Sequence, residues 1–111
     1  MLHYSDHPLT KVFGALADAS RRAIVIRLTR GPATVSELAQ PLPMTLSAVG
    51  QHLKVLESSG IVRSKKRGRT RVCYINRRAL SASEAWFTAR RREMTKRLDR
   101  LEEFLNEENR G

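Results

Sequence analysis

Apolar residues recur at helical spacing in the first half of the chain and give way to an alternating pattern near residue 61. Ile24 and Leu28 lie on one face of the segment 20–28. The segment 9–17 carries its own apolar stripe, made of Leu9, Phe13, Leu16 and Ala17. These spacings predict two core-facing helices.

The segment 45–57 predicts a third, more informative helix. Val49, Leu53 and Leu56 follow one another at i, i+4 and i+7 and therefore share a face. The opposite face carries polar side chains, Ser47, Gln51 and Lys54. One interpretation is an ordinary solvated surface. The other is a helix that inserts its N-terminal half into the major groove of DNA, where an amide can pair with adenine.

The preceding segment, 34–40, favours the second interpretation. Thr34 and Glu37 have the spacing of a capping box, and Pro41 and Pro43 end the segment. A short helix, a tight turn and a second helix with polar residues outward is the order of a helix-turn-helix.

Residues 61–75 predict a β-hairpin. Gly60 lies where the preceding helix would be capped, and Gly68 supplies the freedom for the turn. The sixteen residues 63–78 contain eight Lys and Arg and no acid. Such a wing can follow phosphates or place an Arg in the minor groove, although charged residues also keep a sheet edge soluble. The cations at and beside its tip are Lys65, Lys66, Arg67, Arg69 and Arg71.

A long terminal helix is predicted from about residue 83 to 108. It carries a stripe of apolar residues, Phe87, Met94, Leu98, Leu101 and Leu105. Because the upstream elements already close a small core, we expect this stripe to pack against a second copy of the chain. The alternative, folding back on its own core, suits Trp86 and Phe87 better than the Leu98–Leu105 stretch. A two-fold dimer would present two recognition helices about 34 to 36 Å apart and predict a palindromic operator.

The 111 residues, 41% of them hydrophobic, predict one domain, residues 1–111, of a mainly α fold with a small β-hairpin wing. Residues 1–78 hold 14 Lys and Arg against 4 acids, whereas residues 79–111 hold 7 against 7. The whole excess of positive charge therefore lies with the helix-turn-helix and wing, which favours double-stranded DNA over a membrane surface as partner. The short apolar runs and the absence of a signal pattern predict a cytoplasmic protein.

Other chemistry has weak support in the sequence. No nucleophile and base have a recognisable spacing, so we expect no enzyme and no cofactor. His3 and His7 would form a metal pair only on a helix, which Pro8 disfavours, and we expect no metal site. Cys73 reads as a packing residue, with a redox-sensing thiol as the alternative. Arg21 and Arg22 in the first turn of a helix are mildly unfavourable there, which suggests an external contact.

Several linked motifs resemble the ArsR family of bacterial repressors over roughly residues 9 to 105. They are Leu16-Ala-Asp-Ala-Ser-Arg-Arg22, Thr34-Val-Ser-Glu-Leu-Ala39, Leu46-Ser-Ala-Val-Gly-Gln-His-Leu-Lys-Val-Leu56, Gly60-Ile-Val62, the wing Arg67-Gly-Arg-Thr-Arg-Val-Cys-Tyr-Ile75, and Ala85-Trp-Phe87. The resemblance implies a winged-helix dimer that blocks transcription by occupying an operator. It also implies that Ser47, Gln51 and His52 lie at the DNA surface, with Arg67 and Arg69 on the wing. The candidate DNA contacts are Thr45, Ser47, Ala48, Gln51, His52, Lys54, Lys65, Arg67, Arg69 and Arg71.

The chain departs from the family in two ways. It lacks the cysteine pair of metal-sensing members in residues 35–39, and residues 79–111 contain no His or Cys. The resemblance thus points to a branch without a metal sensor, and any small-molecule effector is unknown. Gly50 replaces a larger polar residue, for which close approach of the backbone to DNA or to the preceding helix is a possible reason. Three classes of function remain. The first is a specific repressor, with or without a responsive Cys73 thiol. The others are a sequence-indifferent DNA-coating protein and an enzyme, which has poor support.

Overall fold

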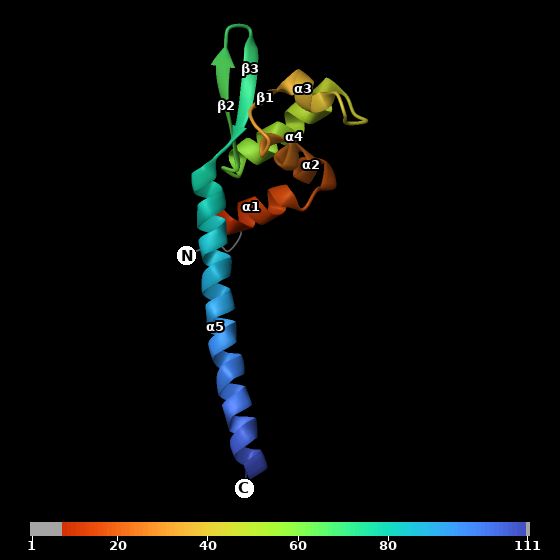
Figure 1. The fold of residues 1–111 in the computed structure, drawn as a ribbon. Helices are drawn as coiled ribbons and strands as arrows, with labels where there is room; N and C mark the ends of the chain where they lie inside the picture. Colours follow the sequence, from red (N-terminus) through yellow and green to blue (C-terminus); the bar gives the residue numbers. More distant parts are fainter. Residues whose placement is uncertain (1–7, 111) are drawn as a thin grey trace, which may run out of the picture. The chain divides into compact units, whose positions relative to one another are not determined.

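The computed structural model describes residues 8–110 and divides the chain into two compact units, one ending at Ala79 and one beginning at Leu80. Helix α5 starts in the first unit and continues through the second. Within the described residues the elements are α1 (Pro8–Leu16), α2 (Ala19–Leu28), β1 (Ala33–Thr34), α3 (Val35–Ala39), α4 (Leu46–Ser58), β2 (Val62–Arg67), β3 (Thr70–Ile75) and α5 (Arg77–Arg110) (Figure 1).

Side-chain caps explain where the helices of the first unit begin. Asp18 precedes α2, and its Oδ1 accepts hydrogen bonds from the backbone N–H groups of Ser20 at 2.8 Å and Arg21 at 3.1 Å. The hydroxyl of Thr45 accepts from the N–H of Ala48 at 3.1 Å and begins α4. These side chains satisfy N–H groups that have no partner within the helix.

The predicted capping box of α3 is confirmed. Thr34 Oγ1 accepts from the backbone N–H of Glu37 at 3.2 Å, and Glu37 Oε1 accepts from the backbone N–H of Thr34 at 3.4 Å. The box therefore starts the first helix of the helix-turn-helix where the sequence indicated.

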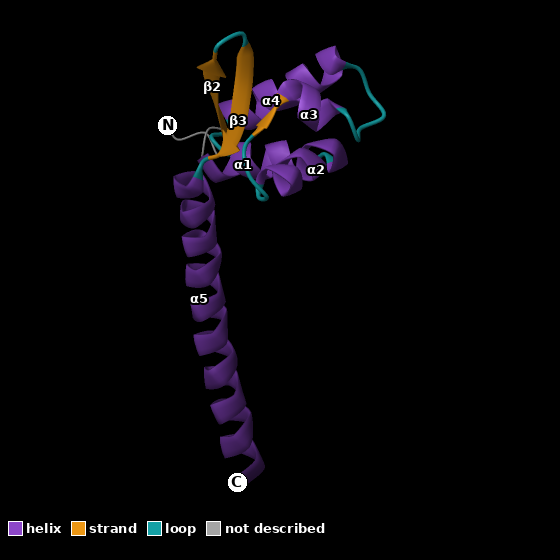
Figure 2. Ribbon diagram, turned by 45° about the horizontal axis from the view of Figure 1, so that its top comes forward, coloured by secondary structure: helices purple, strands orange, loops and turns teal. Residues whose placement is uncertain are grey.

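The sheet has one strand more than the predicted hairpin. Ala33 pairs with Cys73 and Thr34 with Val72, so the described strands form an antiparallel sheet in the order β1-β3-β2 (Figure 2). A strand of two residues is too short to show an alternating pattern, which is why the sequence did not reveal it. Its effect is to attach the start of the helix-turn-helix directly to the wing.

The two glycines expected at chain reversals both have left-handed backbone. Gly68 has a φ of 64° in the turn between β2 and β3, and Gly60 has a φ of 87° just after the C-cap Ser59 of α4. A side chain with a Cβ is strained in this region, so glycine at these points makes both the hairpin and its departure from α4 possible.

The core lies among α1, α2, α3, α4 and the sheet. The predicted inward positions of α2 and α4 are confirmed, because Ile24, Leu28, Val49, Leu53 and Leu56 are all buried. The remaining buried side chains are Val12, Ala15, Ala33, Leu38, Ile61, Val62 and Cys73. Packing of α4 against α3, the sheet, α1 and α2 holds it with its polar face outward.

The prediction for α1 was wrong about which face is inward. Val12 and Ala15 are buried, whereas Phe13 is 40% exposed and Ala17 is exposed as well. Leu16 contacts the core and is partly buried. Since neighbouring residues differ by about 100° around a helix, a shift of one residue rotates the inward face away from the stripe that Phe13 suggested.

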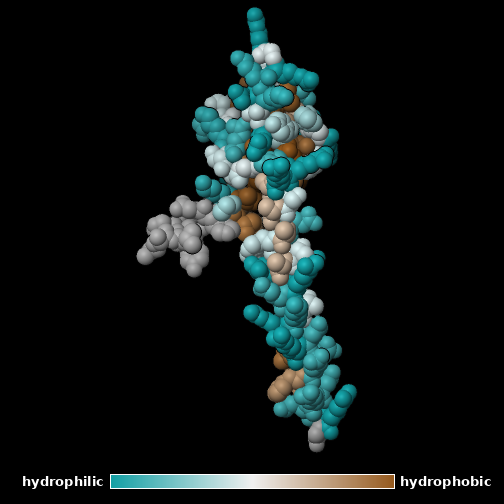
Figure 3. Space-filling model, turned by 90° about the vertical axis from the view of Figure 1, so that its left-hand side faces the viewer, coloured by the Kyte–Doolittle hydropathy of each residue, from teal (hydrophilic) through white to brown (hydrophobic). Residues whose placement is uncertain are grey.

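Helix α5 begins six residues before the predicted start at residue 83 and runs to Arg110. Asn76 explains this early start, because its Oδ1 accepts from the backbone N–H of Arg78 at 3.2 Å while its Nδ2 donates to Gly60 O at 2.9 Å. No residue within Arg77–Arg110 is buried. Figure 3 shows hydrophobic side chains interspersed with hydrophilic ones along this helix. None of the described helices has a stretch long and apolar enough to cross a membrane.

Candidate nucleic-acid interface

The outward face of α4 carries the predicted DNA-reading side chains. Ser47, Gln51 and Lys54 are exposed, as is the capping residue Thr45, while Ala48 and His52 are half-buried. The apolar side chains of the same helix are in the core. The structure therefore places the six α4 candidates on or beside one accessible helix surface, ordered from its N-terminus.

The wing places its cations on two faces. Arg63, Lys65 and Arg67 pair with Tyr74, Val72 and Thr70, and by strand alternation they lie on one side of the sheet. The other side carries Lys66 opposite Arg71. Arg69 lies in the turn, and all these cations are exposed. The wing residues among the candidate contacts begin at Lys65. The alternation i, i+2, i+4 along β2 would have added Arg63 to them.

Arg71 differs from the other wing candidates in having a partner within the sheet. Its Nη1 donates a hydrogen bond of 2.8 Å to Ser64 Oγ. The donor groups left over on this guanidinium can still contact a phosphate, but the side chain is held along the strand.

Arg21 and Arg22 have internal contacts that account for their position. Arg22 Nη1 donates to the backbone oxygens of Leu16 at 2.8 Å and Ala17 at 3.0 Å. Arg21 donates from Nε to Ala15 O at 2.6 Å and from Nη2 to Gly14 O at 3.3 Å. Both guanidinium groups thus cap carbonyl groups at the end of α1, which gives an internal reason for two arginines in the first turn of α2.

Arg21 also reaches α4, the helix that carries the predicted DNA contacts. Its Nη1 lies 3.3 Å from Nδ1 of His52 on α4, and both side chains are partly buried. Sequence reasoning missed this contact because the two residues are 31 positions apart. Only the packing of α2 beside α4 brings them together.

Asp18 completes this corner of the molecule. The hydrogen bond from the Arg21 backbone N–H is the main cause that lowers the pKa of the Asp18 carboxyl, aided by Ser20 and by the charges of Arg21 and His52. The carboxylate is therefore stabilised where it caps α2.

Comparisons with known proteins agree with this geometry. A family model described as a helix-turn-helix domain matches residues 16–65. The HTH-type transcriptional regulator Rv2034 of Mycobacterium tuberculosis is 46% identical over 72 residues, which cover 65% of this chain and 67% of that protein. A crystal structure of an ArsR family transcriptional regulator superposes with a TM-score of 0.75 at 45% identity, covering 79% of this chain and 97% of the other. The chain belongs to the ArsR family of winged helix-turn-helix transcriptional regulators.

The ArsR resemblance seen in the sequence motifs is thereby confirmed, together with the winged-helix fold and DNA binding. A third similar structure is a solution structure of a possible ArsR-family regulator from Mycobacterium bovis, described as a homodimeric winged helix-turn-helix DNA-binding domain. It superposes with a TM-score of 0.63 at 25% identity and covers 80% of this chain and 90% of that one.

Cys73 of this ArsR-family chain is a packing residue. Its side chain is 1% exposed on the inner face of β3. Burial is the main cause that raises the pKa of the thiol, with Glu57 adding to the rise and Arg71 opposing it. Because the thiolate is the reactive form, both burial and the raised pKa disfavour the redox-sensing alternative.

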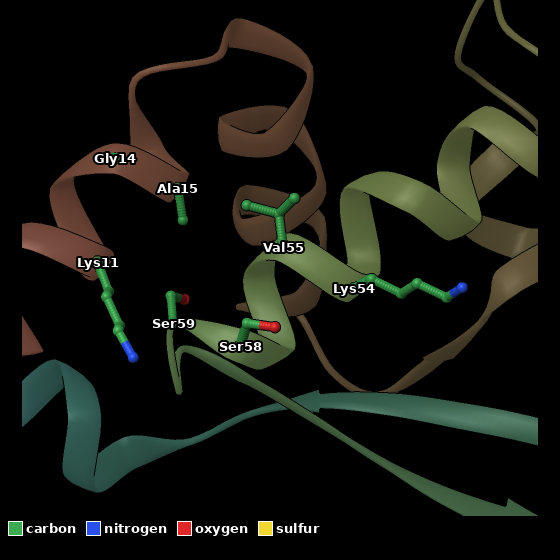
Figure 4. A pocket seen from close by; sticks show the side chains of 7 residues that line it. All are labelled: Lys11, Gly14, Ala15, Lys54, Val55, Ser58 and Ser59. Carbon is green, nitrogen blue, oxygen red and sulfur yellow. The ribbon is translucent and has the colours of Figure 1, made fainter. Parts of the chain in front are cut away.

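A pocket of about 450 Å³ lies between α1 and α4 of the regulator (Figure 4). Ala15 and Val55 contribute hydrocarbon from the two helices, and Lys54 points away from it in Figure 4. The other lining residues are Lys11, Gly14, Ser58 and Ser59. Among the candidate DNA contacts, Lys54 alone lines this pocket.

Metal-ligating side chains do not gather within the part of the chain that the structure describes. There, no three His, Cys, Asp or Glu residues lie close enough together to hold an ion. His3 and His7, the pair considered from the sequence, lie outside the described residues.

Proposed function

We propose that this ArsR-family regulator is a homodimeric repressor that binds a palindromic operator through the major groove. The carrying observation is the exposed row of Ser47 and Gln51 on α4, beside a wing whose cations have no acid among them. Base edges in the major groove offer the donors and acceptors that Gln51 can match, and wing cations suit the phosphate backbone or the minor groove.

The composition of α5 supports the homodimer. Phe87, Met94, Leu98, Leu101 and Leu105 are each between 52% and 58% exposed, and Phe104 is 57% exposed beside them. These residues form the seam of the proposed dimer. From Met94 to Leu105 they follow the coiled-coil spacing of four and three residues. A concave region of about 560 Å³ between Phe87 and Met94 offers room for a side chain of a second helix. The homodimeric state of the Mycobacterium bovis relative supports the same proposal.

A two-fold dimer presents two copies of α4 with the same residues. The operator should then contain two inverted half-sites whose centres lie about 34 to 36 Å apart, one turn of DNA. A dimer bound to such a site would block transcription by excluding the transcription machinery from the DNA. This mechanism needs no catalytic group.

Selection from a random duplex pool at near-physiological salt, followed by sequencing of the bound fraction, tests this proposal. Enrichment of an inverted repeat with one-turn spacing supports it. Uniform retention of all sequences would contradict it and favour a sequence-indifferent coating function driven by the wing cations. Gln51→Ala in the same selection serves as the control, because it should lose base preference at defined positions while keeping general DNA affinity.

A further inference from the structure

The contact between Arg21 and His52 determines where the imidazole carries its proton. Arg21 Nη1 lies 3.3 Å from His52 Nδ1. A guanidinium group has N–H donors and no acceptor, so Nδ1 has to offer its lone pair. A neutral imidazole with unprotonated Nδ1 carries its hydrogen on Nε2.

Arg21 is held independently of His52. Its Nε donates to Ala15 O at 2.6 Å, its Nη2 donates to Gly14 O at 3.3 Å, and its backbone N–H is bound by Asp18. Because the guanidinium is planar, these contacts orient all of its N–H groups together. The His52 ring therefore meets a donor whose direction is set by the end of α1.

We infer that Arg21 is a positioning residue for DNA binding, which keeps His52 as the Nε2–H tautomer so that the ring presents a hydrogen-bond donor to a DNA phosphate. This rests on the proposed function, in which the α4 surface lies against the duplex. Phosphate oxygens only accept hydrogen bonds and are the commonest polar contacts of DNA-binding proteins. A ring with the proton on Nδ1 would offer a lone pair to the phosphate and repel it.

The tautomer can be read in the free protein from the ring nitrogen and proton resonances of a ¹⁵N-labelled sample at about pH 9, where imidazole is neutral. The His52 signals, assigned by their loss in His52→Gln, should show a protonated Nε2 and an unprotonated, hydrogen-bonded Nδ1. Arg21→Ala should move both ring nitrogens toward the averaged positions of a histidine in water. Arg22→Ala is the matched control, because Arg22 caps the same end of α1 by donating to Leu16 O and Ala17 O instead of reaching His52, and it should leave both signals in place. A proton on Nδ1, or equal shifts in the two arginine variants, would overturn the inference.

A double-mutant cycle on the selected operator tests the consequence for binding. Arg21→Ala and His52→Ala should each weaken operator affinity about tenfold, and the double variant should bind no worse than either. Arg22→Ala combined with His52→Ala should show independent effects. If Arg21→Ala weakens binding equally with and without His52, Arg21 does not act through the imidazole and the inference fails. Absence of any preferred operator would contradict the proposed function, whereas the spectroscopic result in the free protein still decides the tautomer.

Discussion

Arg71 is tied to Ser64 by a hydrogen bond of 2.8 Å across the two long strands of the wing. Arg69, two residues earlier, lies exposed in the turn. An arginine that already donates a hydrogen bond within the protein gains less free energy from a phosphate contact than a solvated arginine does. Part of its donor capacity is already satisfied. The two arginines are therefore not equivalent candidates for DNA contact.

We expect Arg69→Ala to weaken binding to all DNA sequences and to reduce the slope of log affinity against log salt by about one unit. Arg71→Ala should change that slope by less. Fluorescence anisotropy titrations at four or five salt concentrations measure both slopes. Equal slopes for the two variants would show that the Ser64 bond does not restrain Arg71 in the complex.

Gln51→Ala should cost about 1 to 3 kcal/mol on the selected operator and little on random duplex, because a bidentate amide contact distinguishes one base from the others. Lys54→Ala offers a comparison on the same helix, since loss of a cation should weaken both DNAs. Competition binding with both duplexes separates the two cases. A loss of equal size on operator and random DNA for Gln51→Ala would remove its base-reading role.

Gly50 has open space where a side chain would begin, because no heavy atom from outside its own helix lies within 4 Å of an added Cβ. Close approach to the preceding helix, one of the two explanations considered for this glycine, is therefore wrong. Gly50→Ala should stabilise the fold by about 0.5 to 1 kcal/mol, because alanine loses less backbone entropy in a helix. If the backbone approaches DNA here, the same variant should bind its operator more weakly. Urea unfolding and operator titration give the two values, and unchanged affinity would leave the glycine without a DNA-related reason.

In the proposed dimer, Leu98→Glu should favour the monomer, since it places a charge in the apolar stripe of α5. Arg100→Glu is a suitable control on the same helix, because it alters an exposed charge about 200° around the helix from Leu98. Light scattering during gel filtration distinguishes the two species. If the Leu98→Glu variant still forms a dimer at the same concentrations as the wild-type protein, the seam is not the interface.

Asp18 predicts an acid-sensitive contribution to stability. The hydrogen bonds from Arg21 and Ser20 lower the pKa of this carboxyl below its ordinary 3.8. The stabilisation is therefore present above about pH 4 and is lost as the pH falls through the lowered pKa. Asp18→Asn keeps a capping oxygen without the titration, so its thermal midpoint should depend less on pH in the acid range. If the thermal midpoints of both proteins depend on pH in the same way in the acid range, Asp18 makes no acid-sensitive contribution to stability.

Local patterns were enough for most elements of the first unit. The capping box of Thr34 and Glu37 and the glycines at 60 and 68 depend on contacts within a few residues. The inward positions of α4 follow from its helical period, because every third or fourth residue meets the same core. The candidate DNA contacts could be named from the sequence for the same reason, because they are the polar remainder of that helix and a run of cations.

The sequence by itself thus determined the helix-turn-helix, the wing and the family, all of which are written in short-range spacing and charge. Only the tertiary structure decided the inward face of α1, the third strand at Ala33 and the role of Arg21. These features depend on groups from distant parts of the chain, as His52 does for Arg21. The free energy of such contacts comes from packing elements together, and no local pattern of residues records which elements become neighbours.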